Sequence, residues 1–222
     1  GWDSIFVVGL DVVNRGLQKK HASCLQTFDY KKNDEELDVG YSILGEFGSW
    51  QFTANGSNGR LLHLDLPIIK GTLRGYGKDL HMIHGPYYKV HPLVYDISGY
   101  IITVEIELVW QRDENDPKQT ATLQFSANNN PVNHEQNAIG QVKPVATRFN
   151  RDRSERLDTV FETLLEMAVT DCLNKNLYKI GYVFSTVNPS GAKACEYSFI
   201  RSKEKDEGFI AIAAKKNATA KD

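Results

Sequence analysis

Three histidines stand close together in the chain and are the first candidates for a metal site. His81 and His84 are an odd number of positions apart, so in an extended strand their side chains point to opposite faces and do not converge on one ion. Pro86 and Pro92 interrupt any helix that could bring His81, His84 and His91 together. We therefore expect ordinary surface or cleft histidines, with no metal and no other cofactor.

A row of carboxylates is the second candidate for chemistry. Asp158, Glu162 and Glu166 follow one another at the i, i+4 spacing, which could let two carboxyl groups share a proton in acid–base catalysis. The same spacing is typical of the solvated side of any amphipathic helix. The chain contains no nucleophile-elbow, zinc-protease or Walker motif. These observations predict a protein that is not an enzyme.

A glycine-rich stretch at 71–77 could cradle phosphate, but it lacks the Lys-Ser or Lys-Thr ending that binds phosphate and Mg²⁺. We expect a bend or bulge in a sheet there.

Twenty-six Lys and Arg against 28 Asp and Glu give a net charge of −2, so a nucleic-acid partner is not expected, despite Tyr-Tyr-Lys at 87–89. No apolar run of about 18 residues occurs, which predicts a soluble protein with no transmembrane segment.

One long amphipathic helix, at about 154–178, stands late in a chain that otherwise has the pattern of β-strands. Asp152 and Glu155 form a capping-box-like start, and Lys175 lies near the far end. Such a helix is roughly 37 Å long, which exceeds most small sheets and predicts a sheet that curves around it. Its apolar residues recur at steps of three and four: Leu157, Val160, Phe161, Leu164, Leu165, Ala168 and Cys172.

The rest of the chain supplies that sheet. Alternating apolar residues at 100–110 predict one long strand with one buried face, within an antiparallel meander over 39–149. Further strands are expected at 182–187, 194–200 and 209–213, and a charged loop or exposed hairpin at 29–37. Apolar residues at near-helical spacing predict a first helix over 4–20. We expect a single α+β domain over residues 1–214 and a disordered tail over 215–222.

The opening Gly1-Trp2-Asp3, followed by Val12-Val13-Asn14, resembles the start of the clostridial neurotoxin-cluster accessory family, the OrfX proteins and their forty-seven-kilodalton relative. The resemblance implies the fold of the tubular lipid-binding (TULIP) superfamily, a strongly curved antiparallel β-sheet wrapped around a long α-helix. It also implies a lipid or phosphoinositide ligand, toxin-cluster proteins as partners, and a bacterial protein that is cytoplasmic or secreted. It supplies no catalytic residue.

Together these observations predict a non-enzymatic protein that binds lipid or another apolar ligand in a bacterial toxin-associated or insecticidal setting. The alternative is a protein–protein scaffold with a fully packed core, which an exposed apolar patch on a sheet edge would favour. The residues expected to line an apolar groove, or else to form a ligand-free core, come from the helix and the sheet: Leu157, Phe161, Leu164, Leu165, Ala168, Trp110, Ile106 and Phe125.

Overall fold

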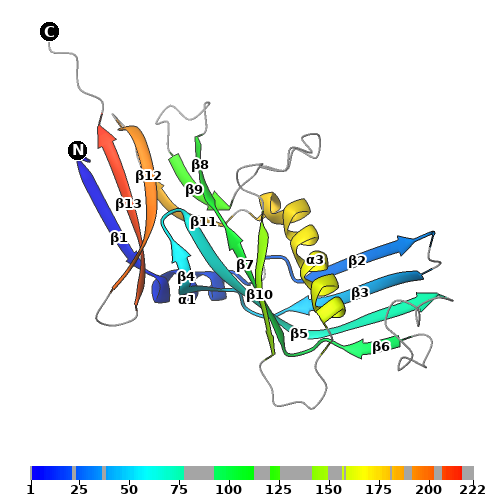
Figure 1. Ribbon diagram of the computed structural model, residues 1–222. Helices are drawn as coiled ribbons and strands as arrows, with labels where there is room; N and C mark the ends of the chain where they lie inside the picture. The colour runs from blue at the N-terminus through cyan, green and yellow to red at the C-terminus, as the bar shows by residue number, and fades with distance from the viewer. Residues whose placement is uncertain are drawn as a thin grey trace, which may run out of the picture.

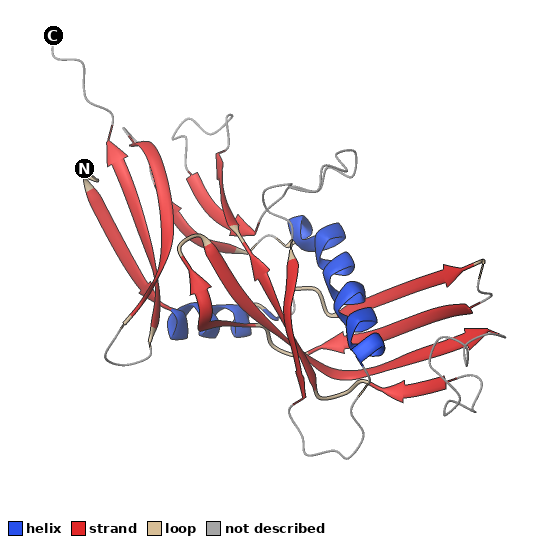
Figure 2. Cartoon of the chain, in the orientation of Figure 1, coloured by secondary structure: helices blue, strands red, loops and turns tan. Residues whose placement is uncertain are grey.

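The computed structural model describes residues 2–21, 24–36, 39–77, 93–112, 121–125, 142–149, 157, 159–180, 182–187, 192–202 and 207–216. Its strands form three antiparallel sheets, and helices α1 and α3 pack beside them (Figures 1 and 2). The expected α+β, β-rich composition is therefore confirmed. His81, His84, His91 and Asp158 lie outside the described residues, as does the expected helix cap at Asp152 and Glu155.

The seven-stranded sheet is built along β5 (Leu61–Gly77), which is 17 residues long. On one edge, β5 pairs with β4 (Gln51–Asn58) and then β3 (Val39–Phe47). On the other edge, it pairs with β7 (Tyr100–Ile106) and then β6 (Leu93–Asp96). The outer positions belong to β2 (Thr27–Asp34), beside β3, and β10 (Lys143–Phe149), beside β7. The charged segment after residue 29 thus forms a hairpin strand, one of the two expected alternatives.

The glycine-rich stretch 71–77 is the regular second half of β5. It pairs residue by residue with β3, and the register shift between Glu46 and Phe47 falls before it. The expected bend or bulge within the stretch is wrong. Gly45 and Gly71 lie opposite each other in this ladder, and a Cβ on Gly45 would come within 2.3 Å of the Phe28 ring. Gly45 therefore permits Phe28 to pack flat on the sheet.

The long strand expected at 100–110 is two strands in different sheets. The alternation itself is confirmed, because Tyr100, Ile102, Val104, Ile106 and Leu108 are all buried. The ladder breaks at position 107. After it, β8 (Leu108–Arg112) pairs with β9 (Ala121–Phe125), and β11 (Val183–Val187) completes that three-stranded sheet. Alternation reports which side of a strand is buried, but it does not report which neighbour the strand pairs with.

The expected first helix is half strand. Residues 4–9 form β1 (Ser4–Gly9), and only then does α1 (Leu10–Lys19) begin. β1 pairs with β13 (Gly208–Lys216), which pairs in turn with β12 (Ala192–Arg201). Four bulky residues at 5–8, three of them β-branched, favour an extended backbone once a partner strand is present. β13 also includes two residues of the expected tail, and 217–222 lie outside the described residues.

The late helix, α3 (Thr159–Asn176), is 18 residues long and is followed by the 3-10 turn η2 (Leu177–Lys179). It packs on β2, β7 and β10, while Val160 and Met167 on its other side are 45% and 38% exposed. The described residues therefore show a helix lying on one face of a sheet (Figure 1), and a long helix wrapped by the sheet is not shown. The expected start was five residues too early. Leu157 is buried but not helical.

Tyr197 on β12 joins the three-stranded sheets to each other. Its hydroxyl accepts a hydrogen bond from the backbone N–H of Leu108 at 2.7 Å and donates to the carbonyl oxygen of Arg60 at 2.8 Å. The residue is 4% exposed, and burial raises the pKa of its hydroxyl to about 12. The neutral form is therefore the one that the fold requires.

We expect Tyr197→Phe to lower the free energy of unfolding by about 1–3 kcal/mol, because it leaves a buried N–H and a carbonyl without partners. The pKa is raised in the folded state, so the contribution is complete below pH 10 and is lost as pH rises from about 10 to 12. Urea denaturation of wild type and Tyr197→Phe at several pH values measures the free energy of unfolding of each protein. The stability difference between wild type and variant should narrow over that interval, and a constant difference would contradict the assignment.

Candidate functional site

The eight residues predicted to line an apolar groove are part of the core. Seven are buried, and Trp110 is partly buried and packs against them. Phe161 on α3 contacts the rings of Tyr41 and Tyr95, with centroids 6.3 and 4.8 Å apart. Phe125 on β9 belongs to a different aromatic group, formed with Trp50, Phe52 and Phe184. The structure thus distributes the predicted residues over two parts of one continuous core.

None of the eight residues lines the two cavities that are described below. One polar observation nevertheless concerns the predicted set. The indole N–H of Trp110 is buried and has no hydrogen-bond partner among the described residues, and the same is true of Trp50. A buried donor without an acceptor costs about 1–3 kcal/mol. An oxygen atom placed beside either indole N–H would supply the missing acceptor.

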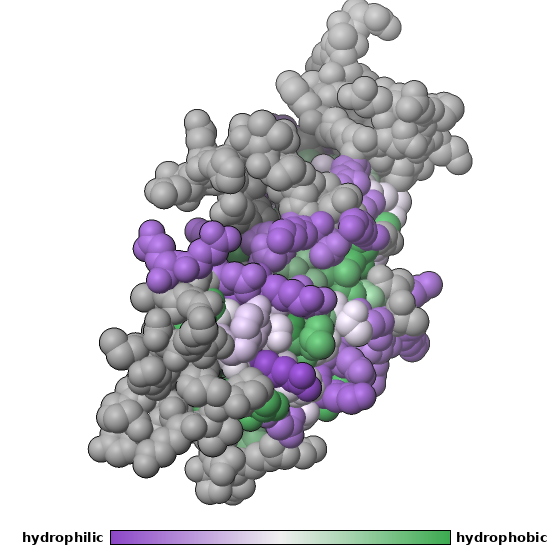
Figure 3. Space-filling view, turned by 90° about the vertical axis from the view of Figure 1, so that its right-hand side faces the viewer, coloured by the Kyte–Doolittle hydropathy of each residue, from purple (hydrophilic) through white to green (hydrophobic). Residues whose placement is uncertain are grey.

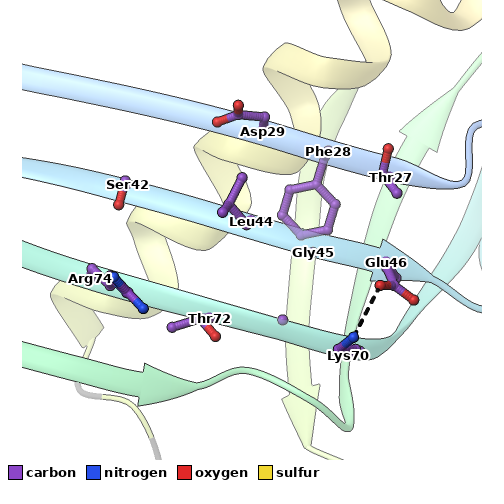
Figure 4. A pocket seen from close by; sticks show the side chains of 11 residues that line it. Thr27, Phe28, Asp29, Ser42, Leu44, Gly45, Glu46, Lys70, Thr72 and Arg74 are labelled. Carbon is purple, nitrogen blue, oxygen red and sulfur yellow. Dashed lines mark ion pairs between the residues drawn. The ribbon is translucent and has the colours of Figure 1, made fainter.

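The first cavity is a shallow groove of about 450 Å³ on the face of β2, β3 and β5 that points away from α3 (Figure 4). Leu44 is 53% exposed near its centre, and Lys70 forms an ion pair with Glu46 at 3.6 Å. The groove is shallow because Gly45, Gly71 and small hydroxyl side chains line its floor. Mixed charges around a single exposed leucine do not define one class of ligand.

The second cavity, of about 960 Å³, lies between the start of α1, strand β4 and the turn that leads into β13. Its lining is mostly polar and includes Asn14, Gln51 and Asn55. Asn14 is already engaged, because its carboxamide donates to the carbonyl oxygen of Phe52 at 2.9 Å and accepts from the N–H of Phe52 at 2.7 Å. The Asn14 side chain therefore makes the two hydrogen bonds to the Phe52 backbone that a neighbouring strand would otherwise make.

Ser57, His63 and Glu105 form a cluster whose residue types suit nucleophilic catalysis. The His63 Nε2 lies 3.6 Å from a Glu105 carboxylate oxygen. The Ser57 hydroxyl, however, accepts from the backbone N–H of His63 at 2.8 Å and donates to the carbonyl oxygen of Thr53 at 2.7 Å. Its proton is directed at the backbone rather than at the imidazole, so the cluster lacks the geometry that activates a serine. Its hydrogen bonds instead tie β4 to β5.

The remaining candidates for catalysis also have structural roles. Glu166, from the expected carboxylate row, accepts a hydrogen bond from the Thr147 hydroxyl at 2.5 Å and so links α3 to β10.

Three cysteines, Cys24, Cys172 and Cys195, are free thiols. Burial raises the pKa of the Cys24 thiol to about 11 and also raises that of Cys172, so neither provides a thiolate at neutral pH. The described residues hold no group of His, Cys, Asp and Glu that could bind a metal.

Strand β1 carries the most exposed large apolar side chains near one another in the chain. Ile5, Phe6 and Val7 are 62%, 59% and 59% exposed, and Trp2 just before them is 40% exposed. β1 is also the edge strand of its sheet, so its outer backbone groups have no ladder partner among the described residues. The sequence prediction missed this surface because it placed these residues in a helix with one buried side.

The face of the sheet that carries Ile5 and Val7 is apolar along β13 and mixed along β12, where Glu196 and Ser198 are exposed on the same face as Ile200. Ile5 lies opposite Ala213, and Val7 lies opposite Ala211, on β13. Across that strand, Ile200 on β12 is 48% exposed. By contrast, the coloured residues on the side at the right of Figure 1 are mostly hydrophilic, with small hydrophobic areas between them (Figure 3). We call residues Ile5, Phe6 and Val7 the β1 patch.

These features define a β-rich module without an assembled catalytic centre in its described residues, with a packed core and one exposed apolar edge. Residues 1–219 match the OrfX-like family, described as Protein OrfX2/OrfX3/P47, and the chain belongs to this family. The resemblance seen at the N-terminus is confirmed. A curated relative, Protein OrfX3 of Clostridium botulinum (strain Kyoto / Type A2), is 26% identical over 199 residues, which is 84% of this chain and 36% of OrfX3.

Two solved structures have the same fold over the whole chain. P47 from Clostridium botulinum A2 matches with a TM-score of 0.66 and 21% identity, and P47 of Clostridium botulinum E1 matches with 0.63 and 19%. The match covers all of this chain but 45% and 46% of those proteins. The chain thus spans less than half the length of these relatives. No helix in the described residues is long and apolar enough to cross a membrane.

Proposed function

We propose that the chain is a non-enzymatic protein–protein interaction module of a toxin-associated assembly, and that it binds its partner through the β1 patch. The exposure of Ile5, Phe6 and Val7 on an edge strand is the observation that carries this proposal. Edge strands are usually protected by charges, proline or bulges, and β1 has none of these between positions 4 and 9. Such an edge can accept another strand by backbone hydrogen bonding, with the apolar side chains adding affinity.

Affinity capture with the proteins encoded beside this gene tests the proposal. Phe6→Lys places a charge in the β1 patch, and Leu44→Lys is a matched control because Leu44 is 53% exposed on a different sheet. We expect wild type and Leu44→Lys to retain the partner and Phe6→Lys to lose at least about tenfold in affinity, since a lysine placed in an apolar contact must be desolvated. Equal capture by all three proteins, or by none, would count against this function.

A second candidate is the predicted binding of a lipid, a phosphoinositide or another apolar ligand between α3 and the sheet. The unpartnered indole N–H of Trp110 lies on β8, away from the strands that α3 contacts, and it supports a ligand in that part of the core, because an ester or carboxylate oxygen would supply the missing acceptor. The surrounding core side chains would have to separate to admit the ligand. Native mass spectrometry of the purified protein checks this directly. A bound mass that disappears in Trp110→Phe supports the ligand, and a purely unliganded spectrum opposes it.

A further inference from the structure

Two Asn-Gly dipeptides lie close together in the chain, Asn55-Gly56 inside β4 and Asn58-Gly59 at its end. An asparagine followed by glycine is especially prone to spontaneous deamidation, because glycine has no Cβ to keep its backbone nitrogen away from the asparagine side chain. Both asparagines are exposed, so the access of water does not distinguish them. A difference in their reactivity has to come from the backbone around them.

The backbone around Asn55 lies outside the ladder between β4 and β5. That ladder pairs Thr53 with His63 and resumes only at Asn58, so residues 54–57 form a bulge. The extra residues of a bulge are left out of the ladder hydrogen bonds. The peptide bond that follows Asn55 is therefore not fixed by pairing with β5.

The backbone around Asn58 is held on both sides. Asn58 pairs with Leu61, and Gly59 forms a bridge with Phe199 on β12, whose N–H donates to the Gly59 carbonyl oxygen. The peptide between Asn58 and Gly59 would have to rotate before the Gly59 nitrogen could reach the asparagine side chain. That rotation would break the pairing, which costs the free energy of at least one backbone hydrogen bond.

Packing explains why position 56 is a glycine. Gly56 has a φ of +83°, which other residues rarely adopt, and a Cβ there would lie 2.2 Å from Cε1 of the His63 ring. Ser57 then anchors the end of the bulge, because its hydroxyl donates to the carbonyl oxygen of Thr53 and accepts from the N–H of His63. The bulge thus requires the residue type that makes Asn55 reactive.

We propose that Asn55 is a site of spontaneous deamidation in the folded protein and that Asn58 is protected. The backbone nitrogen of Gly56 loses its proton and forms a bond to Cγ of Asn55. The bond between Cγ and Nδ2 breaks, and Nδ2 leaves as ammonia with that proton. Water then opens the cyclic imide at one of its two carbonyls, which gives aspartate or isoaspartate without any oxidation or reduction.

The product changes the charge of the second cavity. Asn55 contributes to its lining, together with three carboxylates and one guanidinium group, which belong to Asp11, Asp65, Glu207 and Arg201. A carboxylate at position 55 would add a fourth negative charge to this polar lining. The modification concerns β4 and goes beyond the proposed function, which concerns the β1 patch.

Isoaspartate would also change how β4 is attached to β5. It lengthens the backbone by a methylene group inside the bulge, next to Gly56 on the His63 ring. We expect this to displace the Ser57 hydroxyl from the His63 N–H, from which it now accepts at 2.8 Å. The His63 amide should then exchange its hydrogen with solvent faster.

Ageing of the whole chain at mildly alkaline pH, followed by peptide mass spectrometry with fragmentation, measures deamidation at each position. In the folded protein we expect Asn55 to react at least about tenfold faster than Asn58, the factor that corresponds to opening one backbone hydrogen bond. In urea the two should react at similar rates, since each is followed by glycine. The folded-state rate at Asn55 should rise with pH, because the attacking nitrogen must lose its proton.

Asn55→Gln is the blocking variant, because the longer side chain has to close a larger and less favourable ring, and Asn58→Gln is its matched control. We expect Asn55→Gln to lose most of the deamidation and Asn58→Gln to age like wild type. Equal or faster reaction at Asn58 in the folded protein, or reaction at neither position, would overturn the proposal. Equal exchange of the His63 amide in aged wild type and aged Asn55→Gln would overturn the effect on β4.

Discussion

Phe161→Ala should lower the free energy of unfolding by about 3–5 kcal/mol, the range expected when a fully buried aromatic side chain is truncated. Phe161 is fully buried at the start of α3, where its ring packs between those of Tyr41 on β3 and Tyr95 on β6. Truncation removes both aromatic contacts and leaves a cavity at the point where the helix is held to the long strands. Urea denaturation followed by circular dichroism measures the change.

Val160→Ala is the matched control for Phe161→Ala. Val160 precedes Phe161 in the same helical turn but is 45% exposed, so its truncation should change stability by less than about 1 kcal/mol. The pair therefore compares the two sides of α3 at one point along its length. Similar losses for both variants would mean that the exposed side of α3 is also covered, as a sheet wrapped around the helix requires.

Asn14→Ala is expected to lower the free energy of unfolding by about 2–4 kcal/mol. The Asn14 carboxamide satisfies both the N–H and the carbonyl oxygen of Phe52, and alanine would leave both without partners in a partly buried position. The edge of β4 would then open. Hydrogen exchange of the Phe52 amide, followed by mass spectrometry or NMR, should accelerate with the loss of stability.

Arg15→Ala provides the comparison for Asn14→Ala. Arg15 is the next residue of α1 and forms an exposed ion pair with Asp11 at 2.9 Å, which contributes no more than about 1 kcal/mol. If Arg15→Ala and Asn14→Ala reduced stability equally, the loss could not be assigned to the hydrogen bonds between Asn14 and β4. A slow Phe52 amide in Asn14→Ala would lead to the same conclusion.

The local sequence pattern predicted an element best where the tertiary neighbours of that segment bury the side chains that the pattern marks as apolar. The alternation at 100–108 was confirmed as a buried face, and the apolar arc of α3 was confirmed except at Val160, which is 45% exposed, because burial favours apolar side chains whatever they pack against. The prediction of a helix for residues 4–9 was wrong, because there the local pattern does not decide the structure. Its residues are compatible with either a helix or a strand, and the ladder with β13, about 200 residues away in the chain, decided between them.

The candidate site could be predicted only in part. The sequence identified the apolar residues of α3 and of the sheet, but their assignment to a groove depended on a tube that the described residues do not show. The β1 patch escaped notice, because exposure at a sheet edge depends on strand order, which no local pattern contains. The role of Asn14 was equally invisible, since Phe52 is 38 residues away.

The sequence by itself determined the β-rich composition, the presence of a late helix with buried apolar residues, the absence of recognisable catalytic motifs and, through residues 1–14, a resemblance to the family that the match over residues 1–219 confirms. These are properties of residue types and short spacings, which local physics constrains. Only the tertiary structure decided that α3 lies on one sheet, that 100–110 serves two sheets, and that Ile5, Phe6 and Val7 are left at an unpaired edge. Each of these depends on contacts between distant segments, and apolar side chains are compatible with many such contacts.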